Sequence, residues 1–491
     1  MASIHWPLIR ELAARPFRTR IIDDTRSYRG LDLLVASLTL ADAIDRRSTS
    51  RTLAFLLPTS GLTPLAMLAA WSLGKTVVPL NYLLKPEELQ YVVDDCETDT
   101  IVTVRAMLEF MGHTPRCKNI IFLEDLPFKS IPMPRWPALN DDSDLGVLLY
   151  TSGTSGKPKG VMLSHANITS NIRQIRSWIP FGRDEVFLGC LPQFHSFGLT
   201  ALTLLPLLCG CKVIFAPKFV PQRIIRLFRD HRPSVFIAIP SMFNALLHLK
   251  DASADDFKSL RFSVSGGEPL PDTIIKRFKE RFNVTIAEGY GLTETSPVSN
   301  WCRPDEYKVH SVGRPLPEMT QKIISIEHGQ ELPPDQDGEI RMRGPNIMQG
   351  YFKLPDATAA AFDEHGYFRT GDIGRFDQQG HLYITGRLKE MLIIGGENVF
   401  PREIEEVINT HPSIKDCGVI GITDPMRGEQ PVAFVELKEG ETFDPQSILS
   451  LCRGKLANYK VPAEIRHLES LPRNPTGKIM RRELKKLLTP Q

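Results

Sequence analysis

Eleven residues in the first third of the chain combine the side chains that can hold a polyphosphate. They read YTSGTSGKPKG, from Tyr150 to Gly160. Glycines let the backbone approach a ligand closely, and neighbouring hydroxyl and ammonium groups can bind phosphate oxygens. Those groups belong to Thr151, Ser152, Thr154, Ser155, Lys157 and Lys159. The composition of this segment indicates a nucleotide enzyme.

Two simpler interpretations compete with this one. A P-loop needs Ser or Thr after its Gly-Lys pair, but Pro158 follows Gly156 and Lys157 here, so the P-loop pattern fails. An ordinary solvated loop has much the same composition. The context favours a ligand-binding loop, because an apolar run at 144–150 predicts a buried strand before it. Helical spacing of isoleucines after Ser164, a possible cap, predicts a helix after it.

The segment resembles the phosphate-binding loop of the adenylate-forming superfamily. That superfamily includes acyl-CoA synthetases, aryl-CoA ligases, luciferases and the adenylation domains of peptide synthetases. The match is nearly complete over the eleven residues, and further motifs of the family follow in the same order, so the resemblance covers essentially the whole chain. It implies that the loop binds ATP through Thr151, Ser152, Gly153, Thr154, Ser155 and Lys159.

The chemistry that this resemblance implies sets clear demands on a site. A carboxylate must attack the α-phosphorus of ATP, so two anions must meet and pyrophosphate must leave. Charge neutralisation and alignment are therefore the main tasks of the protein. The site needs cations, a metal ion and hydrogen-bond donors at the α-phosphate.

The stretch EGYGLTET, residues 288–295, is the second motif. It follows NVTIAEG, which reads as a strand, so its polar residues are expected at a strand end; taken alone it reads as a turn. By resemblance, Tyr290 stacks on adenine, Thr293 contacts the α-phosphate, and Glu294 holds Mg²⁺ together with Thr154. The resemblance also assigns to the ATP site Glu288, Gly289 and Gly291, the last of which borders the acyl pocket too.

Two further segments are expected to surround the nucleoside. SGGEPLP is similar to the segment beside adenine, where Gly267 and Glu268 would line the base. Fatty-acid members often have a small residue in place of Glu268, which leaves the substrate subclass open. In YFRTGDIG, Asp372 could accept hydrogen bonds from both ribose hydroxyls, although a lone Asp is usually a turn residue. The GRLKE segment that follows supplies Arg387, the family's second ribose and phosphate contact.

The catalytic lysine of the family corresponds to Lys478, in NPTGKIMRREL near the carboxyl terminus. As an isolated residue it would be an ordinary surface lysine. By resemblance its ammonium bridges the carboxylate and the α-phosphate, and it must leave before a thiol approaches. The family achieves this by rotating a lid about a hinge, here Lys389. Gly395 and Gly396 would then give the pantetheine arm of CoA close backbone approach.

The acid itself is expected beside LPQFHSFGLT, residues 191–200, which is similar to the mouth of the family's acyl pocket. His195 would lie beside the reacting carboxylate as a catalytic residue, with Phe194, Phe197 and Gly198 as pocket wall. These residues could also be plain core, an interpretation that is equally compatible with the sequence for Phe197, whereas for His195 the family match favours the site. The segment HSFGL, residues 195–199, is most similar to the corresponding segment of synthetases that act on medium or long fatty chains.

The elements that must position these residues follow from periodicity. From Arg20 to about Val213, apolar runs alternate with helical patterns, which predicts layered α/β architecture. After about Ser311, short strands and turns predict a β-rich subdomain. We expect a large multi-layer α/β amino-terminal domain at 1–386 and a small mobile α+β lid domain at 387–491.

Composition limits the classes of function and the cellular locations that are compatible with the chain. The chain has 491 residues, 42% hydrophobic and 24% charged, with a formal net charge of +2, which gives no case for nucleic-acid binding. The eight cysteines lack redox or zinc spacing and read as buried thiols of a reducing cytosol. No stretch is apolar enough for a signal peptide or a membrane span. A cytoplasmic location is therefore expected.

Three functions are compatible with these observations. The first is an AMP-forming ligase that joins a medium- or long-chain fatty acid to CoA, using ATP and Mg²⁺. The second is an adenylating enzyme that loads an acyl carrier protein, since the chemistry before the thiol step is identical. The third is a non-catalytic ligand-binding protein with the same fold. The presence of Glu294, Asp372, Arg387 and Lys478 argues against the third.

Overall fold

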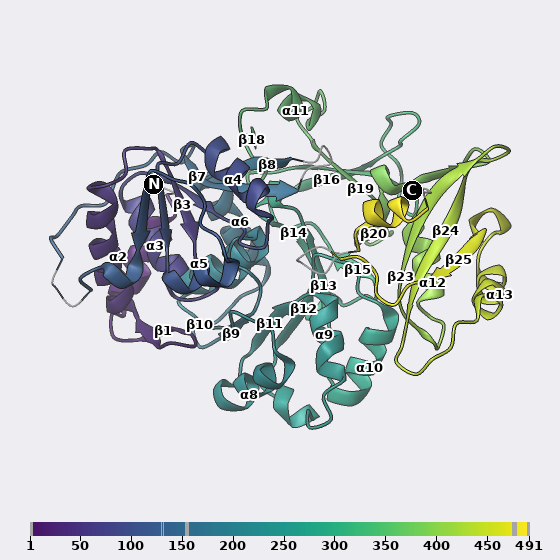
Figure 1. Ribbon diagram of the computed structural model, residues 1–491, viewed down its shortest axis with the longest axis horizontal. Helices are drawn as coiled ribbons and strands as arrows, with labels where there is room; N and C mark the ends of the chain where they lie inside the picture. The colour runs from purple at the N-terminus through teal and green to yellow at the C-terminus, as the bar shows by residue number, and fades with distance from the viewer. Residues whose placement is uncertain (1–2, 129, 131, 153–156, 474–478, 489–491) are drawn as a thin grey trace.

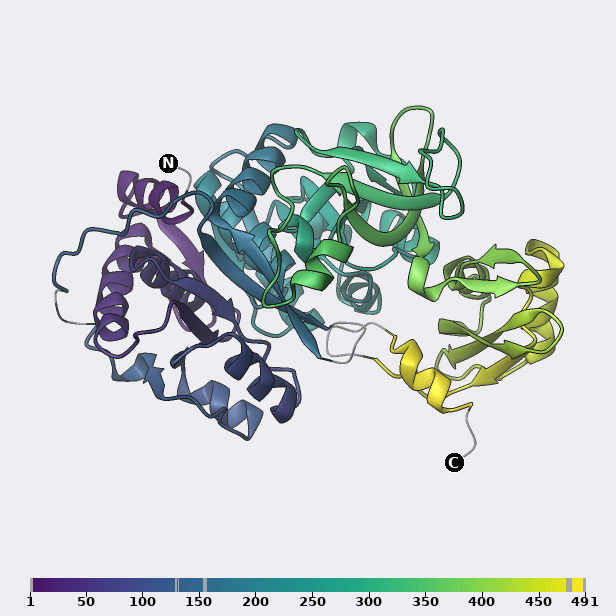
Figure 2. The same cartoon turned by 90° about the horizontal axis from the view of Figure 1, so that it is seen from above.

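The computed structural model describes residues 3–128, 130, 132–152, 157–473 and 479–488, with Ser152 described in its backbone only. Within these residues, two large sheets with helical cover form most of the molecule, and a smaller α+β part lies at one end of the long axis (Figures 1 and 2). This is the mixed, multi-layer α/β architecture with a small carboxyl-terminal domain that the sequence predicts.

The first large sheet has eight strands and is mainly parallel. The order is β14-β13-β12-β11-β9-β10-β1-β2, and only the outer pairs β1–β2 and β13–β14 are antiparallel. Its strands are β1 (Thr19–Ile22), β2 (Ser27–Arg29), β9 (Val186–Gly189), β10 (Lys212–Phe215), β11 (Val235–Ala238), β12 (Phe262–Ser265), β13 (Ala287–Gly291) and β14 (Val298–Trp301). Central strands such as β11 are apolar throughout and buried on both faces, as parallel strands require.

The second sheet carries the polyphosphate segment. Its order is β18-β8-β7-β4-β3-β5-β6. The strands are β3 (Thr52–Leu56), β4 (Thr76–Pro79), β5 (Thr100–Thr103), β6 (Asn119–Phe122), β7 (Leu145–Ser152), β8 (Pro158–Ser164) and β18 (Gly350–Tyr351).

Helices cover these sheets and fill the space between them. They are α1 (His5–Ala14), α2 (Gly30–Asp45), α3 (Leu62–Ser72), α4 (Pro86–Asp95), α5 (Arg105–Met111), α6 (His165–Trp178), the π-helical segment η2 (Phe197–Leu204) with its continuation α7 (Leu205–Cys209), α8 (Pro221–His231), α9 (Pro240–Leu247) and α10 (Asp272–Phe282). Short 3₁₀ turns are η1 (Leu123–Asp125), η3 (Ala254–Phe257), η4 (Thr293–Thr295) and η5 (Pro304–Glu306). No helix in the described part of the chain is long and apolar enough to cross a membrane.

A third sheet is antiparallel and follows Ser311. Its order is β15-β20-β19-β17-β16, with β15 (Ser311–Gly313), β16 (Thr320–Ile324), β17 (Gly338–Arg343), β19 (Phe368–Phe376) and β20 (Leu382–Arg387), and the helix α11 (Pro355–Ala360) lies beside it in the chain. The 3₁₀ turn η6 (Leu388–Glu390) then leads into the carboxyl-terminal part.

The carboxyl-terminal part has its own sheet and its own apolar core. The strands are β21 (Leu392–Ile394), β22 (Glu397–Val399), β23 (Ile414–Asp424), β24 (Gly428–Leu437) and β25 (Glu464–His467). Its helices are α12 (Pro401–Ile408), α13 (Pro445–Lys455) and α14 (Arg481–Lys486), with the 3₁₀ turn η7 (Asn458–Lys460). Pro401 occupies the first helical position of α12, where its missing N–H costs nothing.

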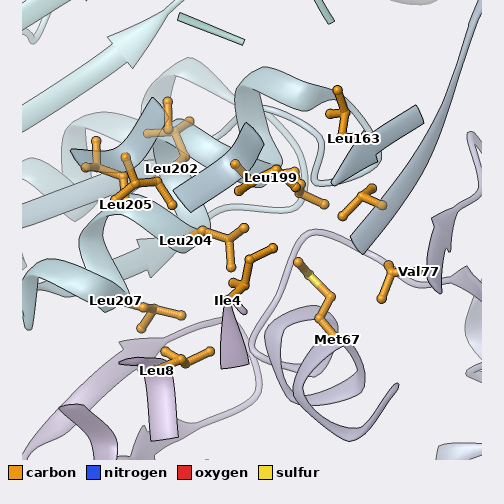
Figure 3. Close-up of a cluster of buried hydrophobic side chains, with 14 of the residues drawn as sticks. Ile4, Leu8, Met67, Val77, Leu163, Leu199, Leu202, Leu204, Leu205 and Leu207 are labelled. Atoms are coloured by element: carbon orange, nitrogen blue, oxygen red, sulfur yellow. The ribbon is translucent and has the colours of Figure 1, made fainter. Parts of the chain in front are cut away.

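The main core joins segments that are distant in sequence. Figure 3 shows Ile4 of the amino-terminal segment beside Met67 of α3 and below Leu199 of η2, with Leu8 of α1 and Leu163 of β8 in the same cluster. All five of these side chains are at most 1% exposed. Burying this apolar surface fixes the position of η2, and hence of the acyl-pocket motif, relative to the hairpin that carries the polyphosphate segment.

The structure corrects the local setting of two motifs. β8, and not a helix, follows the phosphate segment: β7 and β8 pair antiparallel, with Thr151 opposite Lys159, and α6 begins only at His165. Asp372 lies in the middle of β19 and not in a turn, because β17 and β20 pair with β19 on either side. The EGYGLTET motif begins in β13 and continues past its last residue, Gly291, so its polar residues Thr293 and Glu294 lie at a strand end as expected.

Cysteine burial agrees with the prediction at seven positions, while Cys117 is partly exposed. Ser164 caps α6 as predicted, its hydroxyl accepting the N–H of Asn167.

Candidate active site

One cavity of about 2330 Å³ brings together most of the residues that the sequence singled out. It is lined by Thr151, Lys159, His195, Phe197, Gly267, Glu268, Glu288, Gly289, Tyr290, Gly291, Thr293, Glu294, Asp372, Arg387 and Lys389. Phe194 and Gly198 are buried behind the lining. Gly153, Thr154, Ser155 and Lys478 lie outside the described residues.

Asp372 is the centre of a polar cluster. It lies directly opposite Arg387 in the pairing of β19 and β20, and Arg387 Nε is 2.9 Å from its Oδ1. The Tyr290 hydroxyl donates a hydrogen bond to Oδ2 at 2.6 Å. Asp372 raises the pKa of Arg387, and burial raises the pKa of Tyr290 well above its usual value. An ionised carboxylate has about four acceptor sites, so two further donors such as a ribose diol can still bind.

Glu294 supplies a buried carboxylate beside the phosphate hairpin. Its Oε1 accepts a hydrogen bond from the Tyr351 hydroxyl at 2.9 Å, and burial raises its pKa. Lys159 Nζ lies 5.4 Å from the centre of the Tyr351 ring, within the range of a cation–π contact. The sequence gives no sign that Tyr351 belongs to the site, because its strand β18 pairs with β8, which is distant in the chain.

The donor set around Glu294 fits a magnesium ion that is held mainly by phosphate. No cluster of three or more His, Cys, Asp or Glu side chains that could hold a metal occurs among the described residues. Mg²⁺ bound to nucleotides commonly takes one or two carboxylates, several waters and phosphate oxygens. A single buried carboxylate next to a polyphosphate hairpin therefore suits this ion.

The acyl-pocket motif meets the nucleotide motif at close range. The hydroxyl groups of Ser196 and Thr293 are 3.3 Å apart. Ser196 had not been singled out from the sequence, although it lies between two residues that were. A Cβ atom at Gly291 would fall 1.9 Å from the carbonyl oxygen of Pro297. This position must therefore be glycine, because the end of β13 passes close to the residue before β14.

Aromatic rings form one wall near the predicted acyl mouth. The rings of Phe194 and Tyr82 meet edge to face with centres 4.8 Å apart, and Phe197 packs against Gly266. His195 is exposed and borders the cavity. The arrangement places apolar surface next to the polar cluster, as a site for an amphipathic acid requires.

The adenine segment faces the carboxyl-terminal part across the cavity. Gly267 has a φ of +83°, a conformation that favours glycine. Burial tends to lower the pKa of Arg473, but the neighbouring carboxylates Asp416, Glu436 and Glu268 raise it. Glu268 thus lies within electrostatic range of the lid. Burial raises the pKa of Glu288 to about 7, and His310 Nδ1 is 4.0 Å from its Oε1.

The lid presents one particular face to the cavity. Arg473 and Ile479, which flank the segment containing Lys478, both line it, whereas Gly395 and Gly396 do not. Lys389 lies in η6, the 3₁₀ turn between the two parts. Arg402 of α12 donates a hydrogen bond to the carbonyl of Ile384 in β20, which holds the lid against the third sheet.

Fold and site together define a two-domain nucleotide enzyme with an apolar pocket beside its polyphosphate segment. Comparison with known proteins agrees: residues 10–352 match the family model of the AMP-binding enzyme, and residues 403–478 match that of the AMP-binding enzyme C-terminal domain. The chain belongs to the family of AMP-binding enzymes.

Relatives and solved structures share most of their length with this chain. A long-chain-fatty-acid–CoA ligase of Bacillus subtilis (strain 168) is 31% identical, over 97% of this chain and 93% of its own. A sulfoacetate–CoA ligase of Cupriavidus necator is 32% identical, over 89% and 87%. The ATP-bound structure of MatB from Rhodopseudomonas palustris has a TM-score of 0.90 at 28% identity, covering 99% of this chain and 98% of that chain.

These likenesses establish the class of activity. The protein is an AMP-forming acid:CoA ligase that works through an acyl or aryl adenylate. ATP and CoA are its co-substrates, and Mg²⁺ is its cofactor. The relatives act on different acids, so the acid belongs to the proposal below.

Proposed function

We propose that the protein activates a medium- or long-chain fatty acid as its acyl adenylate and transfers the acyl group to CoA. The observation that carries the proposal is the single cavity shared by Glu294, Asp372 and a largely apolar set of side chains. That set includes Leu191, Phe197, Ile237 and Met242. Apolar lining of this extent suits an alkyl chain better than a small polar acid.

In the first half-reaction, the acid's carboxylate attacks the α-phosphorus of ATP. Lys478 would lie between the two anions, Thr293 would donate to the α-phosphate, and Asp372 with Arg387 would hold the ribose. His195 would border the carboxylate. Glu294, with Thr154, would hold Mg²⁺, which neutralises phosphate charge when bound. These groups act by aligning and neutralising charge, and none forms a covalent bond with substrate.

The second half-reaction needs the lid to turn. The lid residues that line the cavity include Arg473 and Ile479, on either side of the segment that contains Lys478, which suits adenylation. Rotation about Lys389 would bring the loop at Gly395 and Gly396 to the cavity instead. That loop would admit the pantetheine arm, and its thiol would displace AMP from the acyl adenylate. A motion of this size could limit turnover.

The test is exchange of labelled pyrophosphate into ATP across a panel of alkyl, aryl and short polar acids. We expect the strongest exchange with medium or long alkyl chains. Acids that support exchange are then supplied with CoA or with acyl carrier protein. Thioester formation with the carrier protein alone would replace the CoA proposal by the carrier-loading alternative, and no exchange with any acid would refute catalysis.

A further inference from the structure

One part of the cavity, called the arm, is lined by elements other than those that carry the nucleotide motifs. Its walls come from α5, from the segments that follow β9 and β10, and from α9. The parallel strands β9, β10 and β11 end at the same edge of the first sheet, which is where α/β sheets bind ligands. Inner residues such as Ile237 are buried, while Phe110 is 55% exposed, so the arm opens at its outer end.

A row of aromatic rings runs beside this arm: Tyr82 and Phe110 line the cavity, and Phe194 is buried next to Tyr82. Phe194 packs on Tyr82 with ring centres 4.8 Å apart, and Tyr82 packs on Phe110 at 6.2 Å. The ammonium of Lys218 lies 5.1 Å from the centre of the Phe110 ring and ends the row. Phe194 adjoins His195 at the inner end, so the row connects the predicted carboxylate position with the Lys218 ammonium.

The opposite wall is one face of α9 and is polar at its outer end. Ser241, Asn244, Ala245 and His248 line the cavity at positions i, i+3, i+4 and i+7, which share one helical face. Ser241 and His248 are exposed. The arm is therefore apolar inside and hydrogen-bonding at its rim.

The part of the cavity lining that forms the arm carries a positive charge and no negative one. The lining residues that α5, the segments after β9 and β10, and α9 contribute include Lys218 and no carboxylate. Other lysines of the chain, such as Lys308 and Lys322, have carboxylate partners at 2.6 Å. Lys218 forms no ion pair within the described part of the chain, and its ring contact leaves its hydrogen-bond donors available to a ligand.

We propose that Lys218 is a specificity-determining residue that binds a second anionic group at the far end of the acid. The preferred substrate class is then a long acid with a terminal carboxylate, an α,ω-dicarboxylic acid. This inference rests on the proposed function and refines it. The apolar middle of the arm holds the methylene chain, and Ser241 or Asn244 can add hydrogen bonds to the terminal group. Lys218 is exposed at the open end of the arm, so it would pair with a terminal carboxylate that stays in contact with water.

The experiment compares monocarboxylic and α,ω-dicarboxylic acids of equal chain length. The quantity measured is the ratio of their kcat/KM values in CoA ester formation, for the wild type, Lys218→Met and Lys218→Arg. We expect the preference for the dicarboxylic acid, measured as this ratio, to fall by about two- to five-fold in Lys218→Met, through KM, and to recover in Lys218→Arg. Lys250→Met is the matched control, because Lys250 is exposed near α9 but does not line the cavity.

Several outcomes would overturn the inference. One is an unchanged ratio in Lys218→Met, and another is an equal fall in the Lys250→Met control. A third is a rise in KM for CoA with no change in the ratio, because Lys218 would then contact a CoA phosphate. Failure of the proposed function itself looks different, since no acid of either kind would then support pyrophosphate exchange.

Discussion

At the residue scale, the nucleotide half of the site depends on direct pairs between side chains. Asp372 is held by Arg387 at 2.9 Å and by the Tyr290 hydroxyl at 2.6 Å. Glu294 is held by Tyr351. Asp372 is oriented by side chains from β13 and β20, and Glu294, in the 3₁₀ turn η4, is oriented by a side chain from β18, which preorganises the acceptors before a ligand binds.

Asp372→Asn tests the role of this carboxylate. The amide keeps the shape but removes the charge that Arg387 and a ribose diol require, so we expect KM for ATP to rise about ten-fold or more. The measurement is ATP–pyrophosphate exchange at varied ATP. A change confined to KM for the acid would contradict the assignment. Asp337→Asn, on an exposed pair with Arg375, is a control that should leave KM for ATP unaltered.

Lys478→Ala tests the assignment of the catalytic lysine. Removing a cation from the point where two anions meet should slow adenylation by about 10² or more. Thioester formation from supplied acyl adenylate should be largely intact, because in the proposed mechanism that step uses the loop at Gly395 and Gly396 instead of Lys478. The two half-reactions are measured separately, and equal loss of both would contradict a rotating lid.

At the element scale, the start of α6 joins the amino-terminal segment to the phosphate hairpin. His165 is the first residue of α6; its Nδ1 accepts the Ile4 N–H at 3.3 Å and its Nε2 lies 3.0 Å from the Asn140 amide. Burial lowers the pKa of His165 from 6.5 to about 4, and burial also lowers that of His5. Both imidazoles are therefore neutral in the folded protein near pH 7.

This burial makes stability depend on pH in a defined window. The unfolded chain protonates His165 below pH 6.5 and the folded chain only below about 4, so the unfolded state binds more protons between these values. The free energy of unfolding should fall as pH drops from 6.5 to 4, by about 3 kcal/mol from this residue. Urea unfolding at several pH values measures the slope. His165→Gln should have a shallower slope, and an identical slope would contradict the prediction.

At the scale of the whole molecule, residues of both domains line one cavity, and the proposed mechanism requires the smaller domain to turn. The lid is held in its present orientation by few contacts across the boundary, among them the hydrogen bond from Arg402 to Ile384 and the packing of Phe400 on Gly386. A boundary of this kind allows relative motion of the parts.

Arg402→Met should weaken this orientation while keeping the length of the side chain. We expect adenylation to slow by about five-fold, since one hydrogen bond of about 1 kcal/mol is lost across the boundary. Thioester formation from supplied acyl adenylate should not slow. Arg466→Met, which removes an exposed pair within the lid, serves as the comparison. Equal slowing of both half-reactions would show that Arg402 supports the fold of the lid instead of its orientation.

The sequence by itself determined the layered α/β class and the identity of the motifs. Apolar periodicity reports burial locally, and the phosphate segment and the Asp372 and Arg387 motifs are continuous in the chain. Their spacing and residue types were sufficient to predict a nucleotide site, and the structure places the described members of these motifs around one cavity.

Only the tertiary structure decided which side chains meet. Pairing with the following strand extended β7 through Ser152 and placed Glu288 and Asp372 inside strands. Pairing of β18 with β8, which is distant in the chain, brought Tyr351 to Glu294. The row from Phe194 to Lys218 likewise joins four segments that no local pattern connects. Strand pairing and side-chain packing are long-range interactions, so their outcome depends on chain topology and cannot be read from a local window of residues.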